Sequence, residues 1–260
     1  MIEVSLEFRN KNNQKIVGKA FVPDGAGSFP AVIFSHGFGS NFRELMHHGE
    51  GFAENGIVCV FFDFCGGGLN SLSDGKMTEM TPLTEVDDLT AVLNEVANLP
   101  YVDPEKIFLQ GESMGGLVSA YVAAHNADKV KGLILWYPAF VIPDDAKRRI
   151  AAGSHDVFNM PIGAKYDTDA VSMGLWTEIV KYRGPVHIIH GDDDLVVPII
   201  YSEKANHLYS DCYLTVIPGA GHGYNDRDSV TAMQLSIDFV RNILNEDSFC
   251  DNAKEAHRVN

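Results

Sequence analysis

The stretch from Ile107 to Gly116 reads IFLQGESMGG and contains the pattern G-x-S-x-G centred on Ser113. The mostly apolar run Ile107–Gln110 has the length and composition of a buried strand, and a helix-like segment follows as far as His125. The pattern therefore predicts a sharp strand-to-helix turn from which a serine hydroxyl projects. Glycines beside the serine relieve the backbone crowding that such a turn imposes.

A serine in this position suits nucleophilic chemistry. Its hydroxyl must stand clear of the backbone, and the first N–H groups of the following helix point toward developing negative charge. A chance match to the five-residue pattern occurs in about one chain in ten of this length. The weight of the prediction therefore lies in the strand and helix on either side of Ser113.

Composition and charge narrow the class of protein. With 260 residues the chain can bury the core of one large domain. The net charge of −15, from 35 acidic and 20 basic side chains, disfavours binding to nucleic acid or anionic membranes. The sequence contains no pattern of a secretory signal and no apolar stretch of membrane-spanning length. We therefore expect a cytoplasmic protein with no nucleic-acid and no membrane partner.

Short apolar runs alternate with helix-like segments along the chain. Val4–Phe8 and Ile16–Val22 flank Asn12-Asn13, which predicts an antiparallel hairpin. The alternation that follows predicts an α/β fold with a doubly wound, mostly parallel sheet. The expected core strands and helices are Pro30–Ser35, Glu44–Glu54, Ile57–Phe64, Thr81–Leu99, Ile107–Gln110, Gly132–Tyr137, Val186–His190, Tyr213–Ile217 and Val230–Leu244.

One region breaks this alternation. Residues 138–183 separate two expected core strands by far more than a usual crossover. Loops of such length are uncommon without a function, so we expect a lid over the site, with a surface insertion of no role as the alternative. The expected organisation is a single domain over residues 1–246 that includes this lid. Residues 247–260 are expected to form a C-terminal tail that can be disordered.

A serine nucleophile needs a base and an acid. His222 lies in GAGHG, after the last expected strand, and is the candidate base. The segment HGDDDLVVP follows another strand and offers Asp192, Asp193 and Asp194, of which Asp194 is our preferred acid. A solvated acidic turn or a metal site are the alternatives. The run lacks the spaced oxygens of a calcium loop, and we expect no metal and no cofactor.

The candidate oxyanion hole comes from a third strand end. SHGFG at residues 35–39 follows the strand PAVIFS. Negative charge on a tetrahedral intermediate needs backbone N–H donors, and we assign those of Phe38 and of Met114, the residue after the nucleophile. His36 is expected to tie this loop down as a structural histidine.

Together, HGFGSN, DFCGGGLNS, GESMGG, HGDDDLVVP and GAGHGY resemble the α/β-hydrolase superfamily. More narrowly, the chain resembles small bacterial cinnamoyl or feruloyl esterases, over a range from about Ile16 to Leu244. This resemblance implies the α/β-hydrolase fold, and it assigns the catalytic and oxyanion roles to Ser113, Asp194, His222, Phe38 and Met114.

In such esterases polar residues of the lid hold the phenolic hydroxyl of a hydroxycinnamate. The resemblance implies that Asp145 supplies the carboxylate, whereas Ala151-Ala152 stand where a second polar partner is expected. A homodimer is compatible with the resemblance. The function that follows is hydrolysis of carboxylic esters, of the hydroxycinnamoyl type, through an acyl-enzyme. The alternatives are a general short-chain carboxylesterase or monoacylglycerol lipase, and a non-catalytic binding protein on a hydrolase scaffold.

Overall fold

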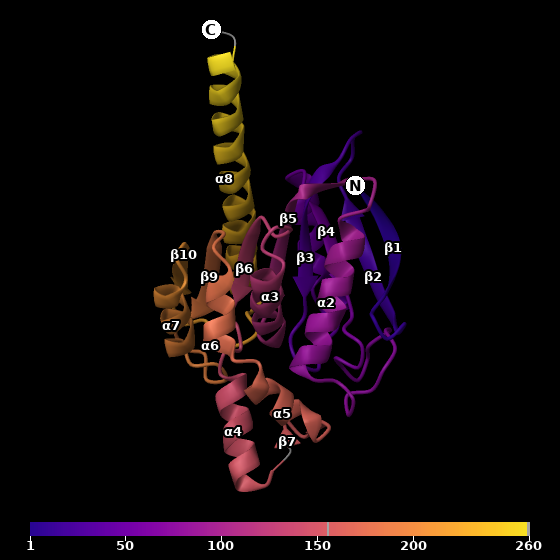
Figure 1. Cartoon of the computed structure of the whole chain (residues 1–260), viewed down its shortest axis with the longest axis vertical. Helices are drawn as coiled ribbons and strands as arrows, with labels where there is room; N and C mark the ends of the chain where they lie inside the picture. The colour runs from indigo at the N-terminus through magenta and orange to yellow at the C-terminus, as the bar shows by residue number, and fades with distance from the viewer. Residues whose placement is uncertain (155, 259–260) are drawn as a thin grey trace.

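The computed structural model describes residues 1–154 and 156–258, and their centre is an eight-stranded sheet (Figure 1). The strand order is β1-β2-β4-β3-β5-β6-β9-β10. All neighbours from β4 to β10 pair in parallel, whereas β1 pairs antiparallel with β2 and β2 with β4. The predicted mostly parallel sheet and N-terminal hairpin are therefore confirmed. The strands are β1 Ile2–Arg9, β2 Lys15–Val22, β3 Phe29–Ser35, β4 Val58–Phe62, β5 Val102–Glu112, β6 Gly132–Trp136, β9 Val186–Gly191 and β10 Cys212–Ile217.

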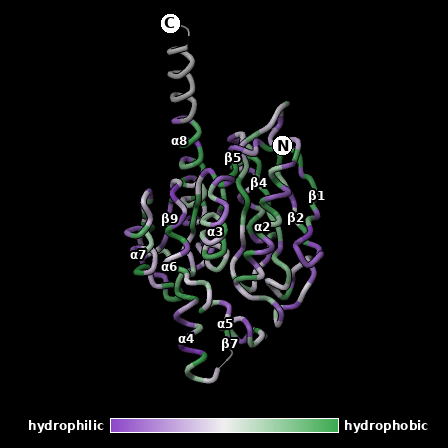
Figure 2. Tube along the Cα trace, in the orientation of Figure 1, coloured by the Kyte–Doolittle hydropathy of each residue, from purple (hydrophilic) through white to green (hydrophobic). Residues whose placement is uncertain are grey.

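Helices cover both faces of the sheet, so the inner strands are buried on both sides. Side chains alternate along a strand, and in β3 Ile33 joins one core while Val32 and Phe34 join the other. Figure 2 shows the resulting concentration of hydrophobic residues in the sheet. The first core lies under α2 Pro82–Val96, α3 Met114–His125 and α7 Ile200–Leu208, and the second lies under α1 Gly49–Glu54 and α8 Asp226–Arg258.

Two predicted helices differ in extent from those observed. Instead of one helix over Glu44–Glu54, the chain forms two 3₁₀ turns, η1 Phe42–Glu44 and η2 Met46–His48, before α1. Asn41 caps the first turn by accepting from the Arg43 N–H at 3.2 Å, which starts the helical path early.

The C-terminal helix is longer than the predicted Val230–Leu244. Asn225 Oδ1 accepts from the N–H of Asp228 at 3.0 Å, and this cap starts α8 at Asp226. The helix then continues to Arg258, through most of the range expected as a tail, and projects away from the body (Figure 1). The segment 245–258 contains neither glycine nor proline, so it lacks the residues that most often end a helix.

The insertion between β6 and β9 lies beyond the carboxyl ends of the parallel strands, with α4, α5 and β7 below the sheet in Figure 1. A hydrogen bond of 2.8 Å from Thr81 Oγ1 to Asp169 Oδ2 ties it to the start of α2. Much of α4 is hydrophilic (Figure 2). The insertion consists of α4 Ile142–Ala152, β7 Asp156–Val157, β8 Met160–Pro161, α5 Lys165–Ser172, α6 Leu175–Glu178 and η3 Ile179–Lys181.

Gly115→Ala is expected to lower the free energy of unfolding by about 2 kcal/mol, because the added methyl group would overlap the backbone carbonyl of Ser35. This loss should appear although alanine favours a helix over glycine by about 1 kcal/mol. Urea unfolding measures the effect. Gly221→Ala is the matched control, since its nearest neighbouring atom, Asp193 O, would lie 3.7 Å away. Equal stability of the two variants would contradict the prediction.

Candidate active site

Ser113 occupies the turn between β5 and α3, as predicted. Its backbone has φ 51° and ψ −116°, a conformation that L-residues rarely adopt. The N–H of Ser113 donates to Trp136 O at 3.0 Å, which anchors the turn to β6. A Cβ at Gly111 would overlap the carbonyl of Gly115, so the flanking glycines are required by close backbone contact. The turn therefore holds the Ser113 hydroxyl clear of the sheet edge.

A chain of hydrogen bonds joins three strand ends. His222 Nε2 lies 2.9 Å from Ser113 Oγ, and His222 Nδ1 lies 2.7 Å from Asp194 Oδ2. With the imidazole proton on Nδ1, His222 donates to the carboxylate and accepts from the serine hydroxyl. The structure thus brings together the three residues predicted for a triad, and the arrangement can remove the proton from Ser113.

The surroundings of Asp194 distinguish it from its two acidic neighbours. Its side chain is fully buried, and its Oδ1 accepts from the N–H groups of Val196 and Val197, both at 2.8 Å. Burial alone would raise the pKa of Asp194, but donors from His190, His222 and Val197 hold that pKa far below its ordinary value. Asp194 therefore remains an anion beside His222.

Asp192 and Asp193 are exposed and lie outside this network. Asp192 Oδ1 accepts from the Gly219 N–H at 2.5 Å, and the N–H of Asp193 donates to Ala220 O at 3.1 Å. Both residues fasten the turn after β9 to the loop that carries His222. Because these contacts do not involve His222, the geometry favours Asp194 as the acid.

His190, which received no role from the sequence, is buried behind Asp194. Its Nε2 lies 3.2 Å from Asp194 Oδ2 and 3.0 Å from Val197 O, while Nδ1 lies 2.7 Å from Ser202 Oγ. With the proton on Nε2, His190 donates toward the carboxylate and accepts from the serine of α7. The sequence signal for this positioning role was a histidine at the end of an expected buried strand.

Glu112 and Tyr137 form a second contact that sequence reasoning missed. The Tyr137 ring packs on His222 with centroids 4.8 Å apart, and its hydroxyl donates to the Glu112 carboxylate. Burial raises the pKa of Glu112 to about 7, although the hydrogen bond from Tyr137 acts in the opposite direction. Tyr137 also has a positive φ of 36°, a backbone conformation that is rare outside glycine.

The predicted oxyanion donors lie on the other side of Ser113. A Cβ at Gly37 would lie 3.3 Å from Ser113 Cβ, so the loop that carries Phe38 passes directly over the serine. Among the described residues, no loop carbonyl accepts from the N–H of Phe38 or Met114. Both groups are therefore available to an oxygen bound near Ser113 Oγ.

His36 fastens the same loop at both ring nitrogens. Its Nδ1 contacts Gly37 O at 2.9 Å, and its Nε2 accepts from the Phe64 N–H at 3.1 Å. The predicted structural role of His36 is confirmed by these two contacts.

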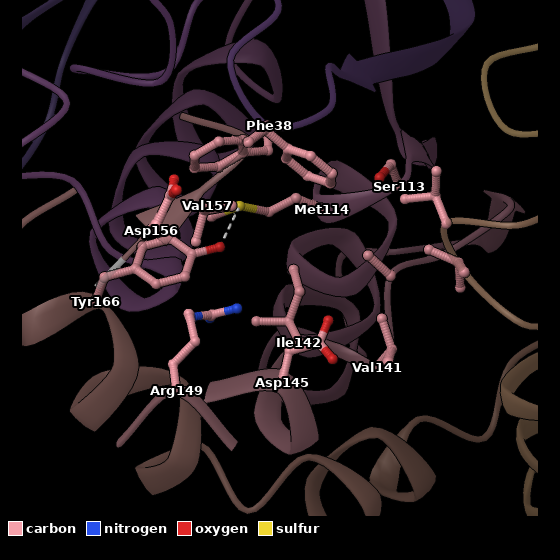
Figure 3. Close-up of a pocket in the computed structure, with 14 residues that line it drawn as sticks. Phe38, Ser113, Met114, Val141, Ile142, Asp145, Arg149, Asp156, Val157 and Tyr166 are labelled. Atoms are coloured by element: carbon pink, nitrogen blue, oxygen red, sulfur yellow. Dashed lines mark hydrogen bonds between the residues drawn. The ribbon is translucent and has the colours of Figure 1, made fainter. Parts of the chain in front are cut away.

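A cavity of about 200 Å³ extends from Ser113 to the insertion (Figure 3). Tyr166 and Phe38 form aromatic walls, and the Tyr166 hydroxyl contacts Met114 Sδ at 3.4 Å. Asp145 and Arg149 stand at the end away from the serine (Figure 3). The lining residues are Phe38, Ser113, Met114, Ala139, Val141, Ile142, Asp145, Arg149, Asp156, Val157, Phe158, Tyr166, Val196 and Val197.

The polar end of this cavity is held by ion pairs. Asp145, expected to bind substrate, lines the cavity and pairs with Arg148. Arg149 Nη2 lies 2.7 Å from the buried Asp167 Oδ1. Arg149 thus lines the cavity beside Asp145, whereas Ala151-Ala152, where a second polar partner was expected, are not among the lining residues. Among the described residues, no three histidine, cysteine or acidic side chains are grouped as metal ligands would be. Nor does the described chain contain a helix that is long and apolar enough to cross a bilayer.

Comparison with known families and sequences gives the following matches. The Hydrolase_4 family, described as "Serine aminopeptidase, S33", matches residues 28–166, a range that includes Ser113. An uncharacterized 31.7 kDa protein of Escherichia coli is 31% identical over 114 residues, which are 44% of this chain and only 38% of that protein. The Escherichia coli K12 protein YfhR is 23% identical over 249 residues, covering 93% of this chain and 81% of YfhR.

Solved structures match over nearly the whole length. Est1E from Butyrivibrio proteoclasticus with bound ferulic acid is 25% identical, with a TM-score of 0.78 and coverage of 93% of this chain and 98% of Est1E. Alpha/beta hydrolase domain-containing protein 10 from mouse is 20% identical, with a TM-score of 0.72 and coverage of 94% and 99%. The predicted α/β-hydrolase fold and the resemblance to feruloyl esterases are thereby confirmed.

Asp194→Asn is expected to lower kcat for an ester by about 10³- to 10⁴-fold, because an amide cannot hold the His222 tautomer or stabilise its charged form. Asp192→Asn and Asp193→Asn, whose side chains do not contact His222, are expected to lower kcat less than tenfold. Steady-state rates on p-nitrophenyl butyrate measure all three. A larger loss in either neighbour than in Asp194→Asn would move the assignment of the acid.

Proposed function

The chain belongs to the hydrolase family described as serine aminopeptidase, S33, and from this membership we propose that it is a serine hydrolase that cleaves carboxylic esters. The observation that carries the proposal is the chain of hydrogen bonds from Ser113 through His222 to the buried Asp194. A binding protein without activity would not need this alignment, so the non-catalytic alternative is disfavoured.

The first half of the reaction forms an acyl-enzyme. His222 Nε2, 2.9 Å from Ser113 Oγ, takes the hydroxyl proton as the serine oxygen attacks the ester carbonyl. The carbonyl oxygen becomes negative and is stabilised by the N–H groups of Phe38 and Met114. The imidazolium, stabilised by Asp194, then gives its proton to the departing alcohol oxygen as the carbon–oxygen bond breaks.

The second half releases the acid. A water molecule takes the position of the departed alcohol, and His222 removes its proton as it attacks the acyl carbonyl. Collapse of the second tetrahedral intermediate frees the carboxylic acid and returns the proton to Ser113. Charge develops only on groups held by the triad and the two backbone donors, so the chemistry needs no metal or organic cofactor.

The cavity toward the insertion supports an aromatic acyl group with a polar end. Phe38 has ring neighbours in Tyr166, 5.9 Å away, and Phe158, 6.2 Å away, and the three rings give the cavity an aromatic lining that favours a flat ring. Asp145 and Arg149 stand at the far end, where an alkyl chain would desolvate them without compensation. A hydroxycinnamoyl group fits this distribution better than the acyl chain of a monoacylglycerol, and Est1E binds ferulic acid.

Ser113→Ala should abolish both ester turnover and covalent labelling by a fluorophosphonate probe, because within the described part of the chain no other hydroxyl hydrogen-bonds to His222. In-gel fluorescence after labelling and rates on p-nitrophenyl butyrate are the two measurements. Ser119→Ala is the control, since Ser119 is buried in α3 away from the triad. Labelling of Ser113→Ala equal to that of the wild type would show that the nucleophile is wrongly assigned.

Asp145→Ala is expected to lower kcat/KM on methyl ferulate at least tenfold relative to methyl cinnamate, which lacks the ring hydroxyl, because a hydrogen bond to a charged group is lost. Asp144→Ala is the matched control, since that carboxylate accepts from Tyr201 and Lys147 outside the cavity.

The same assay separates the alternative substrate classes. Wild-type kcat/KM should be higher on methyl ferulate than on p-nitrophenyl butyrate or a monoacylglycerol. A lower value on ferulate than on both would favour the general carboxylesterase or lipase alternative.

A further inference from the structure

A second cavity of about 220 Å³ lies on the other side of the nucleophile and shares no lining residue with the first. The two hydrophobic cores, one on each face of the sheet, show where this cavity lies. Met114, beside the first cavity, belongs to the core under α3, whereas Trp136 and Tyr137 belong to the core under α8. The second cavity is lined by Ser40, Glu44, Leu45, His47, His48, Glu112, Trp136, Tyr137, Gly223, Tyr224, Asp226 and Ser229.

Three residues that line this cavity are neighbours of the triad in sequence or in space. Glu112 immediately precedes Ser113, Gly223 immediately follows His222, and the Tyr137 ring lies against the imidazole. In the reaction proposed above, the acyl group occupies the cavity on the Met114 side. The alcohol, which receives its proton from His222, then lies outside that cavity, and the second cavity borders His222 through the Tyr137 ring.

The charged side chains that line the second cavity are negative. Glu44 and Asp226 supply two exposed carboxylates, and Glu112 supplies a third whose pKa is raised to about 7 by burial. No lysine or arginine is among the described residues that line the cavity. Burial lowers the pKa of His48 to about 3, with a smaller contribution from His47, so His48 contributes no positive charge at neutral pH. His47 is exposed at the cavity edge, and its Nε2 lies 3.5 Å from Ser229 Oγ.

Aromatic rings form the remaining wall. The Tyr224 ring stands nearly perpendicular to that of Tyr137, with centroids 4.6 Å apart, and lies 5.7 Å from that of Trp136. The Tyr224 hydroxyl is buried and has no hydrogen-bond partner among the described residues. Aromatic faces beside carboxylates attract organic cations, since ring quadrupole and negative charge act together. A neutral alcohol would gain from neither.

We propose that this second cavity binds the alcohol portion of the ester and that this alcohol carries an ammonium group. The inference rests on the proposed ester hydrolysis, which here yields a carboxylic acid and a positively charged amino alcohol. Water supplies the oxygen of the acid, and His222 supplies the proton of the alcohol. The carboxylates of Glu112 and Asp226 are the groups expected to face the ammonium.

Binding tests the inference without turnover. Titration calorimetry on the Ser113→Ala protein compares choline with 3,3-dimethylbutan-1-ol, which has the same shape and a carbon in place of the charged nitrogen. Choline is expected to bind at least tenfold more tightly. Glu112→Gln and Asp226→Asn, each added to Ser113→Ala, should reduce this preference at least threefold. Glu50→Gln, an exposed carboxylate of α1 outside the cavity, is the matched control and should retain it.

Equal binding of the two alcohols, or equal loss of preference in the Glu50→Gln control, would overturn the inference. If Glu112→Gln fails to fold, Asp226→Asn decides the test, because Asp226 is exposed at the first position of α8.

Turnover separates this inference from the proposed function. The wild-type protein is given two butyrate esters, one of choline and one of 3,3-dimethylbutan-1-ol, and kcat/KM is expected to favour the choline ester about tenfold. Equal hydrolysis of both esters overturns the inference and leaves the ester hydrolase standing. No turnover of these esters or of methyl ferulate overturns the proposed function, and with it the assignment of the cavity to a leaving group.

Discussion

The backbone of Ser113 is the constraint on which the rest of the site depends. Its positive φ costs of order 1–3 kcal/mol and persists because the surroundings hold it. Its N–H donates to Trp136 O at 3.0 Å, and its carbonyl accepts from the N–H of Ala139 at 2.8 Å. The turn is thereby fixed to β6 and to the start of the insertion. Because the serine cannot relax, its hydroxyl stays 2.9 Å from His222 and directly under the loop that carries Phe38.

The negative charge of Asp194 is stabilised by buried hydrogen-bond donors rather than by solvent. Asp194 is an anion with four hydrogen-bond donors around it, two of them backbone N–H groups and two of them imidazoles. The carboxylate therefore fixes His222 from one side, while the ring of Tyr137 packs on it from another. Such preorganisation means that little rearrangement is needed when the imidazole becomes positive. His190 and Tyr137 therefore hold the triad in position, His190 through Asp194 and Tyr137 through His222.

Local pattern was enough to predict the sheet and the positions of Ser113 and His222, since the carboxyl ends of parallel strands meet at one edge. It left the acid open among three neighbouring aspartates, of which the family resemblance favoured Asp194. What pattern could not predict depends on packing between distant segments. Arg149 enters the acyl cavity because the buried Asp167, 18 residues later, holds its guanidinium. The contact of Tyr137 with Glu112 needs the register of β5 against β6. The early 3₁₀ turns and the early start of α8 were missed because caps at Asn41 and Asn225 decided where those helices began.

The two cavities on opposite faces of the sheet are built by different parts of the chain. The acyl side belongs mostly to the insertion between β6 and β9, whereas the other side belongs to the segments around residues 40–48 and 223–229. In the proposed reaction, the acyl and alcohol portions of the ester therefore contact separate sets of residues, which can change independently. In a family that shares this scaffold, new specificities can arise by combining one half with another. A mutant library for this protein can therefore vary the residues that line one cavity while the triad and the residues of the other cavity stay unchanged.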